Sequence, residues 1–317
     1  MKKIILFSIV LAVFGGCKKA SETTPALPEF ISIPNKAFEQ TLINLGWDSD
    51  NTINAKIKTQ DALKVYSLKV DWPTVGTITN FAGIEGFTNL SYFDCHSQTG
   101  LTKLDVSKNI NLNFFDFSDT EVTTIDVTNC PNIQTLRCSS NLETIDLSKN
   151  SKINTLLVDD IKAPTFDLSK LPLLTTLSIT NCKNLTSVDL SKVPLLTSLT
   201  LVYCNFPTID LSKVPLLTYL NASGLNLISL DLSKVPKLTF LQIAQNKLTT
   251  IDISIVPILN YFRCDDNRIV VLDLTKNSAI TTLSFYSFYI KKVCVNDVAK
   301  ARDASGWEKS GLYALCQ

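Results

Sequence analysis

Histidine is almost absent from this sequence, since His96 is the only one among 317 residues. One imidazole cannot build a metal site of several histidines, and any pair of a nucleophile and a histidine would have to use His96 itself. None of the 10 glycines belongs to a phosphate-binding loop or a dinucleotide fingerprint. We therefore predict a non-enzymatic protein with no cofactor and no metal centre, and an exposed His96 without a catalytic role.

An excess of charge of either sign is missing as well. The chain carries 30 lysines and arginines against 29 aspartates and glutamates, which gives a formal net charge of +1. A nearly neutral chain without a basic run has no long-range field that would attract nucleic acid. We expect no nucleic-acid partner.

The apolar run at the start of the chain is too short to cross a membrane. It extends over residues 4–14, is interrupted by Ser8 and follows Lys2 and Lys3, whereas a spanning helix needs about 20 apolar residues. A charged start, a short apolar run and small residues before a cleavage site are the parts of a secretory signal peptide. We predict that residues 1–16 are removed on export.

The residue after this segment indicates a lipid anchor. Gly15 and Gly16 are followed directly by Cys17, and this order resembles a bacterial lipobox, whose cysteine becomes acylated. Several acyl chains together give stable anchoring. We expect a lipidated Cys17, a polar tether over residues 17–29, and a place in the cell envelope at the outer membrane, with the cell surface and the periplasmic face both open.

A repeat of about 21 residues fills most of the remaining chain. The segment L/I-D-L/V/I-S/T recurs every 20 to 22 residues, with its aspartate at Asp105, Asp126, Asp146, Asp167, Asp189, Asp210, Asp231, Asp252 and Asp273. A second apolar triplet, L-x-x-L-x-L, begins at Leu90, Leu112, Ile133, Ile153, Leu174, Leu196, Leu217, Leu238, Leu259 and Ile280. Self-similarity at a fixed period is the signature of a repeat solenoid.

Two copies show the whole pattern, LTFLQIAQNKL from Leu238 and LNYFRCDDNRI from Leu259. They match L-x-x-L-x-L-x-x-N-x-L of leucine-rich repeats, which places Asn246 and Asn267 in a turn. One coil cannot bury its own apolar face, so neighbouring coils must stack. We predict a leucine-rich-repeat solenoid over residues 65–293, mainly parallel β, with about eleven coils and short turns on the convex side.

Different segments are expected to cap the two ends. Residues 30–64 contain Asn35 as a helix N-cap, followed by Phe38, Leu42 and Leu45 at helical spacing. Residues 294–317 form the C-terminal cap, in which Cys294 takes the aspartate position of the last coil and Cys316 ends the segment. Two such cysteines in an exported protein predict a disulfide, with two buried thiols as the alternative.

This arrangement resembles the 21-residue leucine-rich-repeat lipoproteins of Bacteroidetes-type bacteria. The matching segments are IPNKAFEQTLINLGWDSDNTIN, the repeated LTxLDLSK units and VCVNDVAKARDASGW. The resemblance spans nearly all of the chain after the signal peptide. It implies an interaction protein at the cell surface or in the periplasm, and it identifies no catalytic residue.

For several polar or reactive residues the sequence leaves two interpretations open. Cys182 and Cys204 share the asparagine position of adjacent coils, which allows a disulfide or two buried thiols. The aspartate row is expected to cap turns, with cation or partner binding as the alternative. The segment from Asp48 to Asn54 has oxygen ligands at alternate positions like an EF-hand, but Ile53 replaces the glycine and no glutamate follows at position twelve. We expect a polar loop there and leave calcium open.

The concave side is the predicted binding surface. The outward positions of the triplets hold five aromatic residues: Tyr92, Phe114, Tyr219, Phe240 and Tyr261. The last three lie on consecutive coils, and beside them stand three hydrogen-bond donors: Asn221, Gln242 and Arg263. Exposed aromatic residues backed by donors suit a protein or a glycan ligand, although such a ladder could merely stabilise strand pairing. We predict a monomeric binding protein; the alternative is a structural or assembly component of the envelope without a diffusible ligand.

Overall fold

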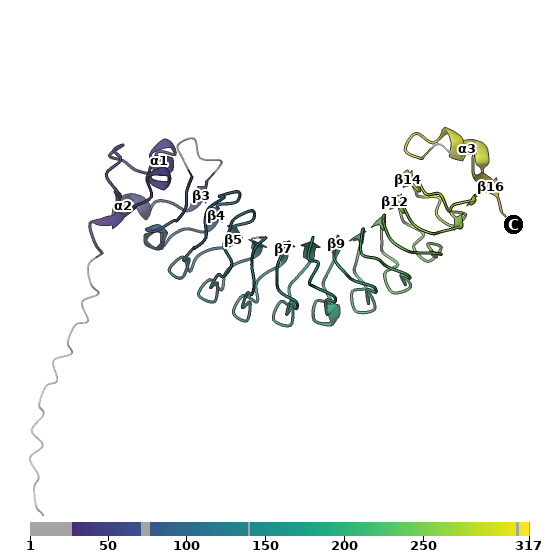
Figure 1. Ribbon diagram of the computed structural model, residues 1–317, viewed down its shortest axis with the longest axis horizontal. Coiled ribbons are helices and arrows are strands. Elements are labelled where there is room, and N and C mark those ends of the chain that lie inside the picture. The colour runs from purple at the N-terminus through teal and green to yellow at the C-terminus, as the bar shows by residue number, and fades with distance from the viewer. Residues whose placement is uncertain (1–26, 71–76, 139, 309–310, 317) are drawn as a thin grey trace, which may run out of the picture.

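The computed structural model describes residues 27–70, 77–138, 140–308 and 311–316, so that Cys17 and the predicted signal peptide lie outside the described residues. The chain forms a curved solenoid with strands along its concave side and turns along its convex side (Figure 1). This confirms the predicted leucine-rich-repeat architecture. None of the helices in the described part of the chain is long and apolar enough to span a membrane.

One parallel sheet of 11 strands lines the concave side, one strand from each coil. In chain order the strands are β3 (Ser67–Lys69), β4 (Tyr92–Asp94), β5 (Phe114–Asp116), β6 (Thr135–Cys138), β7 (Thr155–Asp159), β8 (Thr176–Thr180), β9 (Ser198–Val202), β10 (Tyr219–Asn221), β11 (Phe240–Gln242), β12 (Tyr261–Arg263) and β14 (Thr282–Ser284). Each strand pairs with the next in register. Equivalent positions of successive repeats therefore form straight columns across the sheet.

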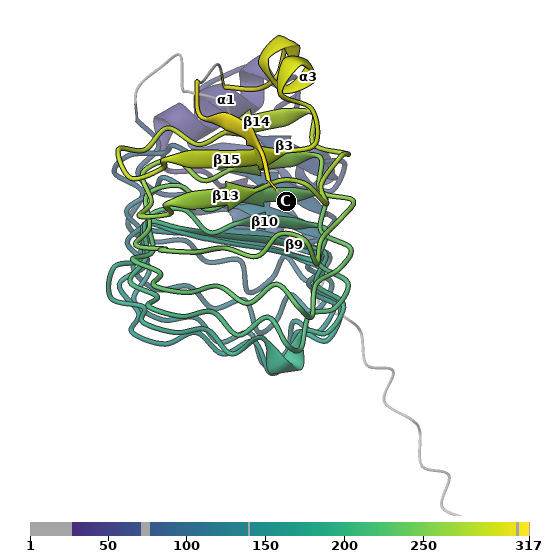
Figure 2. The same cartoon turned by 90° about the vertical axis from the view of Figure 1, so that its right-hand side faces the viewer.

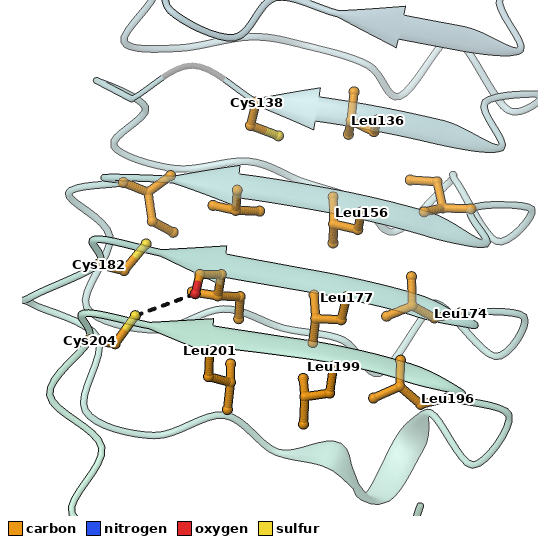
Figure 3. Packing of buried hydrophobic residues seen from close by; sticks show 14 of the residues in the cluster. Leu136, Cys138, Leu156, Leu174, Leu177, Cys182, Leu196, Leu199, Leu201 and Cys204 are labelled. Carbon is orange, nitrogen blue, oxygen red and sulfur yellow. Dashed lines mark hydrogen bonds between the residues drawn. The ribbon is translucent and has the colours of Figure 1, made fainter. Parts of the chain in front are cut away.

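The apolar columns form the core. Leu220, Leu241 and Phe262 are register partners on β10, β11 and β12, and all three side chains are fully buried. Figure 3 shows the same stacking of inward leucines in the middle coils. Truncating such a leucine to alanine removes its burial and leaves a cavity, at a typical cost of about 2–5 kcal/mol.

The convex side is built of short turns, as the 21-residue period predicts. The prolines of the Ser-Lys-Val-Pro segments follow tight turns, one of which is the short 3₁₀ helix η2 (Leu190–Lys192). Strand pairing on this side is confined, among the described residues, to an isolated bridge between Thr124 and Thr144 and to a three-stranded sheet at the C-terminal end, which begins with β13 (Val271–Asp273). Twenty-one residues leave no room for the long helices of larger repeats.

Buried asparagines satisfy the turns that follow β11 and β12. The Nδ2 of Asn246 donates to the carbonyls of Ala222, Ile243 and Ala244 at 2.8–3.2 Å, and its Oδ1 accepts from two backbone amides of the preceding coil. Asn267 makes equivalent bonds one coil later. Because buried backbone groups must be paired, these side chains fix the path of the turn.

Cysteines take over this position in the middle coils. Cys182 and Cys204 are both buried and form no disulfide with each other. Of the two possibilities that the sequence left open, the structure therefore shows free thiols. The sulfur of Cys204 lies 3.6 Å from the carbonyl of Ile179 (Figure 3). Cys130 plays the same part in a second turn, on the convex side, where the equivalent positions are Asn109 and Asn150. This assigns Cys130, whose role the sequence did not reveal.

The N-terminal end combines β1 (Phe30–Ser32), β2 (Lys56–Lys58), α1 (Lys36–Asn44) and α2 (Thr59–Ala62), followed by the 3₁₀ helix η1 (Ile84–Gly86). Asn35 caps α1 as predicted, since its Oδ1 accepts from the amide of Phe38 at 2.9 Å. Phe38 packs edge-on against Phe81, with ring centroids 4.9 Å apart. The predicted apolar face is shorter than expected, because Leu45 lies beyond the helix and is 47% exposed.

The C-terminal end contains β15 (Lys292–Val295), α3 (Val298–Asp303) and β16 (Tyr313–Leu315). β15 pairs with β13 and β16, and α3 lies at the same end (Figure 2). Asp273 and Cys294 are register partners, so the cysteine does occupy the aspartate column. Cys294 and Cys316 form the predicted disulfide.

The aspartate row caps turns. In all nine copies one carboxylate oxygen accepts a hydrogen bond of 2.7–2.9 Å from the amide two residues later. These bonds, together with those from the serine or threonine side chains at the same positions, lower the pKa of eight of the carboxyls, those of Asp105, Asp126, Asp146, Asp167, Asp189, Asp210, Asp231 and Asp273. The bonds stabilise the charged form, which is also the form that holds the turn.

This row makes the free energy of unfolding depend on pH. A carboxyl whose pKa is lower in the folded than in the unfolded chain stabilises the fold above its unfolded-state value, 3.8 for aspartate, and that contribution disappears as the pH falls through the folded-state value. We therefore expect the melting temperature to fall steeply below about pH 4. The double variant Asp189→Asn, Asp210→Asn keeps an oxygen that can accept the turn hydrogen bond at each position. Its melting temperature, measured in thermal melts, should therefore fall less steeply with decreasing pH than that of the wild type. An unchanged dependence of the melting temperature on pH would contradict this account.

The disulfide should stabilise the C-terminal end. It closes a loop with a sequence separation of 22 residues, and in the chain-entropy model a loop of this length contributes about 3 kcal/mol. Replacing both Cys294 and Cys316 by alanine should lower the free energy of unfolding by about that amount in denaturant titrations. Reductant should lower the stability of the wild type and leave that of the double variant unchanged.

Candidate binding surface on the concave sheet

The outward positions of the sheet place the predicted aromatic residues in one column. Tyr219 pairs in register with Phe240, and Phe240 with Tyr261. Their rings are stacked, with centroids 4.2 and 4.1 Å apart and planes within 11° of parallel. We call these three residues the C-terminal ladder. The structure thus brings together the aromatic residues that the sequence placed on consecutive coils.

Stacking decides which part of each ring a ligand can reach. Both faces of Phe240 are covered by its two neighbours, while Tyr219 and Tyr261 each have one face covered. All three side chains remain partly exposed. Because the inner faces are occupied, the ladder offers mainly ring edges and hydroxyl groups to a ligand.

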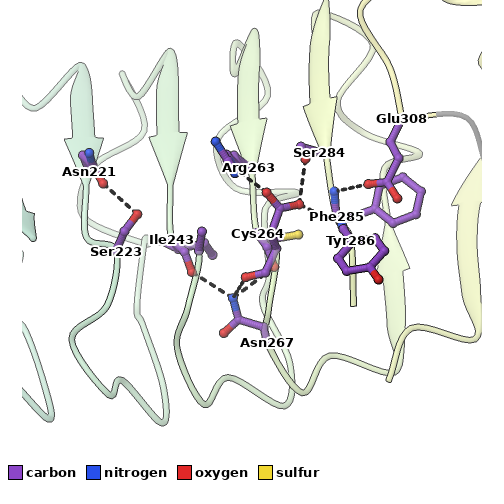
Figure 4. Close-up of polar contacts among 12 residues, drawn as sticks. Asn221, Ser223, Ile243, Arg263, Cys264, Asn267, Ser284, Phe285, Tyr286 and Glu308 are labelled. Carbon is purple, nitrogen blue, oxygen red and sulfur yellow. Dashed lines mark hydrogen bonds and ion pairs between the residues drawn. The ribbon is translucent and has the colours of Figure 1, made fainter. Parts of the chain in front are cut away.

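A polar column runs beside the ladder on the same three strands. Asn221 and Gln242 are half-buried and Arg263 is exposed, and Asn221 Oδ1 accepts a bond of 2.8 Å from the hydroxyl of Ser223. Arg263 forms an ion pair with Asp265, which raises the pKa of the guanidinium (Figure 4). Its direction is therefore fixed before any ligand binds.

Asp265 is a residue of this surface that the sequence reasoning missed. Its carboxylate is 5% exposed and also accepts from the Ser284 hydroxyl at 2.6 Å and the Tyr286 amide at 2.8 Å (Figure 4). It connects β12 to the next coil and orients Arg263. The available signal was its position two residues after Arg263, just beyond the end of β12.

Tyr92 and Phe114 form a separate, N-terminal ladder. Their rings are stacked with centroids 4.3 Å apart, and the guanidinium of Arg137 lies 5.8 Å from the centre of the Phe114 ring. Five coil steps separate Phe114 from Tyr219, or about 24 Å at ordinary strand spacing. The intervening positions of the column hold small residues: Thr135, Thr155, Thr176 and Ser198. The eight predicted ligand-binding residues therefore form two groups.

One group of side chains near the N-terminal ladder could hold a metal ion. Oxygen atoms of Asp94 and Asp116 and a ring nitrogen of His96 lie within 4.8 Å of one another, and no other group of three His, Cys, Asp or Glu side chains in the described part of the chain comes as close together. His96 is less exposed than predicted, with 38% of its side chain accessible, and its Nδ1 lies 2.6 Å from Asp94. That hydrogen bond raises the pKa of His96. Asp116 in turn lies 3.4 Å from Arg137, so both carboxylates already have partners.

Comparison with solved structures identifies the fold, whereas no protein-family model and no curated protein matches the chain. The functional domain of InlJ from Listeria monocytogenes, which includes a cysteine ladder, is similar with a TM-score of 0.76 and 23% identity, over 93% of this chain and 74% of that one. A leucine-rich-repeat protein of Leptospira interrogans, LIC12759, has a TM-score of 0.55 and 15% identity, over 81% and 75%.

A plant peptide hormone receptor, RGFR1, was solved in complex with RGF2; its TM-score is 0.55 at 14% identity, over 82% of this chain and 46% of the receptor chain. At these identities the likeness concerns the fold alone. The chain has the leucine-rich-repeat solenoid fold, with turns of about 21 residues that match those of its structural neighbours.

Proposed function

We propose that this chain is a lipid-anchored protein of the bacterial cell envelope that binds another protein through its concave sheet. The observation that carries the proposal is the C-terminal ladder beside the donors of Asn221, Gln242 and Arg263. Aromatic side chains and arginine dominate the binding energy of protein interfaces. A ladder held rigid by stacking, next to an arginine held by Asp265, loses little conformational freedom on binding.

The stacked geometry favours a protein over a glycan. Sugar rings bind aromatic side chains mainly by lying on a ring face, and the faces of Phe240 are covered on both sides. Ring edges, hydroxyl groups and a guanidinium instead suit the mixed apolar and polar surface of a protein partner. The RGFR1 structure also supports a protein or peptide partner, since this peptide hormone receptor has a similar fold and was solved in complex with RGF2.

The proposed location of the protein rests on features of the sequence alone. Residues 1–16 are proposed as the signal peptide, Cys17 as the acylated residue and residues 17–29 as the tether. The anchored protein would be a monomer at the outer membrane, without enzymatic activity. Its solenoid would present the concave sheet to partners in the envelope or outside the cell.

Removing the ladder should abolish binding. A soluble chain that begins at Ala20, which retains every described strand and helix, would be used to capture partners from envelope extracts. Each captured protein would then be purified and its affinity measured by calorimetry. The triple variant Tyr219→Ala, Phe240→Ala, Tyr261→Ala should bind at least about 100-fold more weakly, because interface hot spots typically contribute about 2 kcal/mol or more each.

The matched control removes three exposed leucine or isoleucine side chains elsewhere. Leu173, Leu195 and Ile258 lie in the turns that follow the convex prolines and are 41–51% exposed; their replacement by alanine should leave the affinity unchanged. If the ladder only stabilises strand pairing, the triple ladder variant will melt earlier yet bind its partner like the wild type. That result would contradict the proposed binding surface.

A further inference from the structure

Three carboxylates are buried where α1, α2 and the loop between them meet. Glu39 of α1 and Asp48 of the loop are each 1% exposed, and Asp61 of α2 is 5% exposed. The loop contacts both helices, since the amide of Asn54 donates to Glu39 at 2.8 Å and the amide of Ser49 to Asp61 at 3.3 Å. Buried carboxylates need hydrogen-bond donors or a positive charge beside them.

Two of these carboxylates have an oxygen that nothing satisfies. Glu39 uses Oε1 to accept from the amides of Asn54 and Lys56, while its Oε2 is buried without a hydrogen-bond partner. Asp48 uses Oδ1 to accept from the amide of Asp50, and its Oδ2 is likewise buried and unpartnered. Within the described ranges neither side chain forms an ion pair. Asp61 differs, because Lys64 lies 2.8 Å from it.

The electrostatic environment makes this arrangement costly. Burial raises the pKa of Asp48, the hydrogen bond from Asp50 opposes that effect, and the negative charges of Asp50, Glu39 and Asp61 raise it further. Mutually repelling carboxylates at a buried position are stable only when a proton or a cation neutralises them. The free oxygens of Glu39 and Asp48 are where such a neutralising group would bind.

The surrounding loop is rich in the oxygen groups that a hard cation binds, although Asp50 already uses both of its carboxylate oxygens, which accept from the Thr52 amide at 2.9 Å and from Asn54 Nδ2 at 2.9 Å. Asp48, Asp50, Thr52 and Asn54 place oxygen atoms at alternate positions of the loop, and six to eight oxygen ligands are what calcium prefers. The glycine of an EF-hand is not needed here, because the left-handed turns fall at Asn51 and Ala55, with φ of 54° and 61°. Glu39 of the preceding helix brings a carboxylate to this loop, since its Oε1 accepts from the amides of Asn54 and Lys56.

We propose that Glu39 and Asp48, together with oxygen atoms of the loop 48–54, form a calcium site that ties this loop to α1. Calcium fits better than magnesium, because an irregular set of protein oxygens suits the flexible coordination of calcium, whereas magnesium requires a near-ideal octahedron and retains its waters. The site lies outside the concave surface and does not depend on the proposed partner.

The test is a calcium titration of the soluble chain beginning at Ala20, after treatment with a chelator. Thermal melts should show the melting temperature rising with calcium chloride, and calorimetry should give a dissociation constant of about 10⁻⁴–10⁻³ M, as in extracellular calcium modules. Magnesium chloride at the same concentrations should produce a much smaller shift. Glu39→Gln retains an oxygen for the amides of Asn54 and Lys56, so it should fold yet bind calcium at least about tenfold more weakly.

The control variant is Asp94→Asn, which alters the other cluster that could hold a metal and should leave calcium binding unchanged. No shift up to about 10 mM calcium, well above the expected range, would overturn the proposal. So would an unaltered calcium affinity in Glu39→Gln, or its loss in Asp94→Asn. If a shared proton neutralises the pair instead, Glu39→Gln will stabilise the calcium-free protein and calcium will have no effect, which also overturns it.

Discussion

In-register parallel pairing of the concave strands is the interaction on which the rest of this structure depends. It joins each residue to the equivalent residue of the next repeat, as in Tyr219, Phe240 and Tyr261. A position in the repeat thereby becomes a column in space. Leucine columns exclude water, asparagine and cysteine columns satisfy the turns, and the aspartate row holds the convex corners. A slip of one residue would exchange inward and outward side chains, so the buried columns also fix the register.

The same pairing holds the proposed binding surface in place. Side chains on adjacent strands lie at the strand spacing of about 4.8 Å, which is close to the distance at which aromatic rings stack. The C-terminal ladder therefore needs no further element to hold it, and Arg263 is oriented by Asp265, two residues further along the chain. The small residues between the two ladders, such as Thr155 and Thr176, leave the middle of the sheet without aromatic side chains.

Features that repeat could be predicted from the sequence, because repetition reveals which positions are equivalent. The coils, the ladder and the place of Cys294 in the aspartate column follow from register, whereas its disulfide with Cys316 was predicted from two cysteines that bracket the C-terminal cap. The role of Cys130 was within reach in the same way, since Asn109 and Asn150 precede and follow it by one repeat. The stacking of the ladder rings could not be predicted, because it depends on side-chain torsion angles that the spacing of residues in the sequence does not reveal.

Features that do not repeat could not be predicted in this way. Asp265 binds Arg263 and the next coil through contacts specific to that end of the sheet. The approach of Glu39 to the loop 48–54 is a tertiary contact between a helix and a later loop. The sequence pattern shows only that position twelve of this loop lacks a glutamate, whereas the fold brings the Glu39 carboxylate within hydrogen-bond distance of the Asn54 amide.

The central claim is that the concave strands near the C-terminal ladder contact a protein partner. Photo-crosslinking in intact cells tests this most directly, with a photoreactive amino acid placed either at Gln242 on the concave sheet or at Ser233 in a convex turn. The account predicts a covalent adduct with one protein from position 242 and none from position 233. Adducts from the convex position alone, or from neither position, would contradict it.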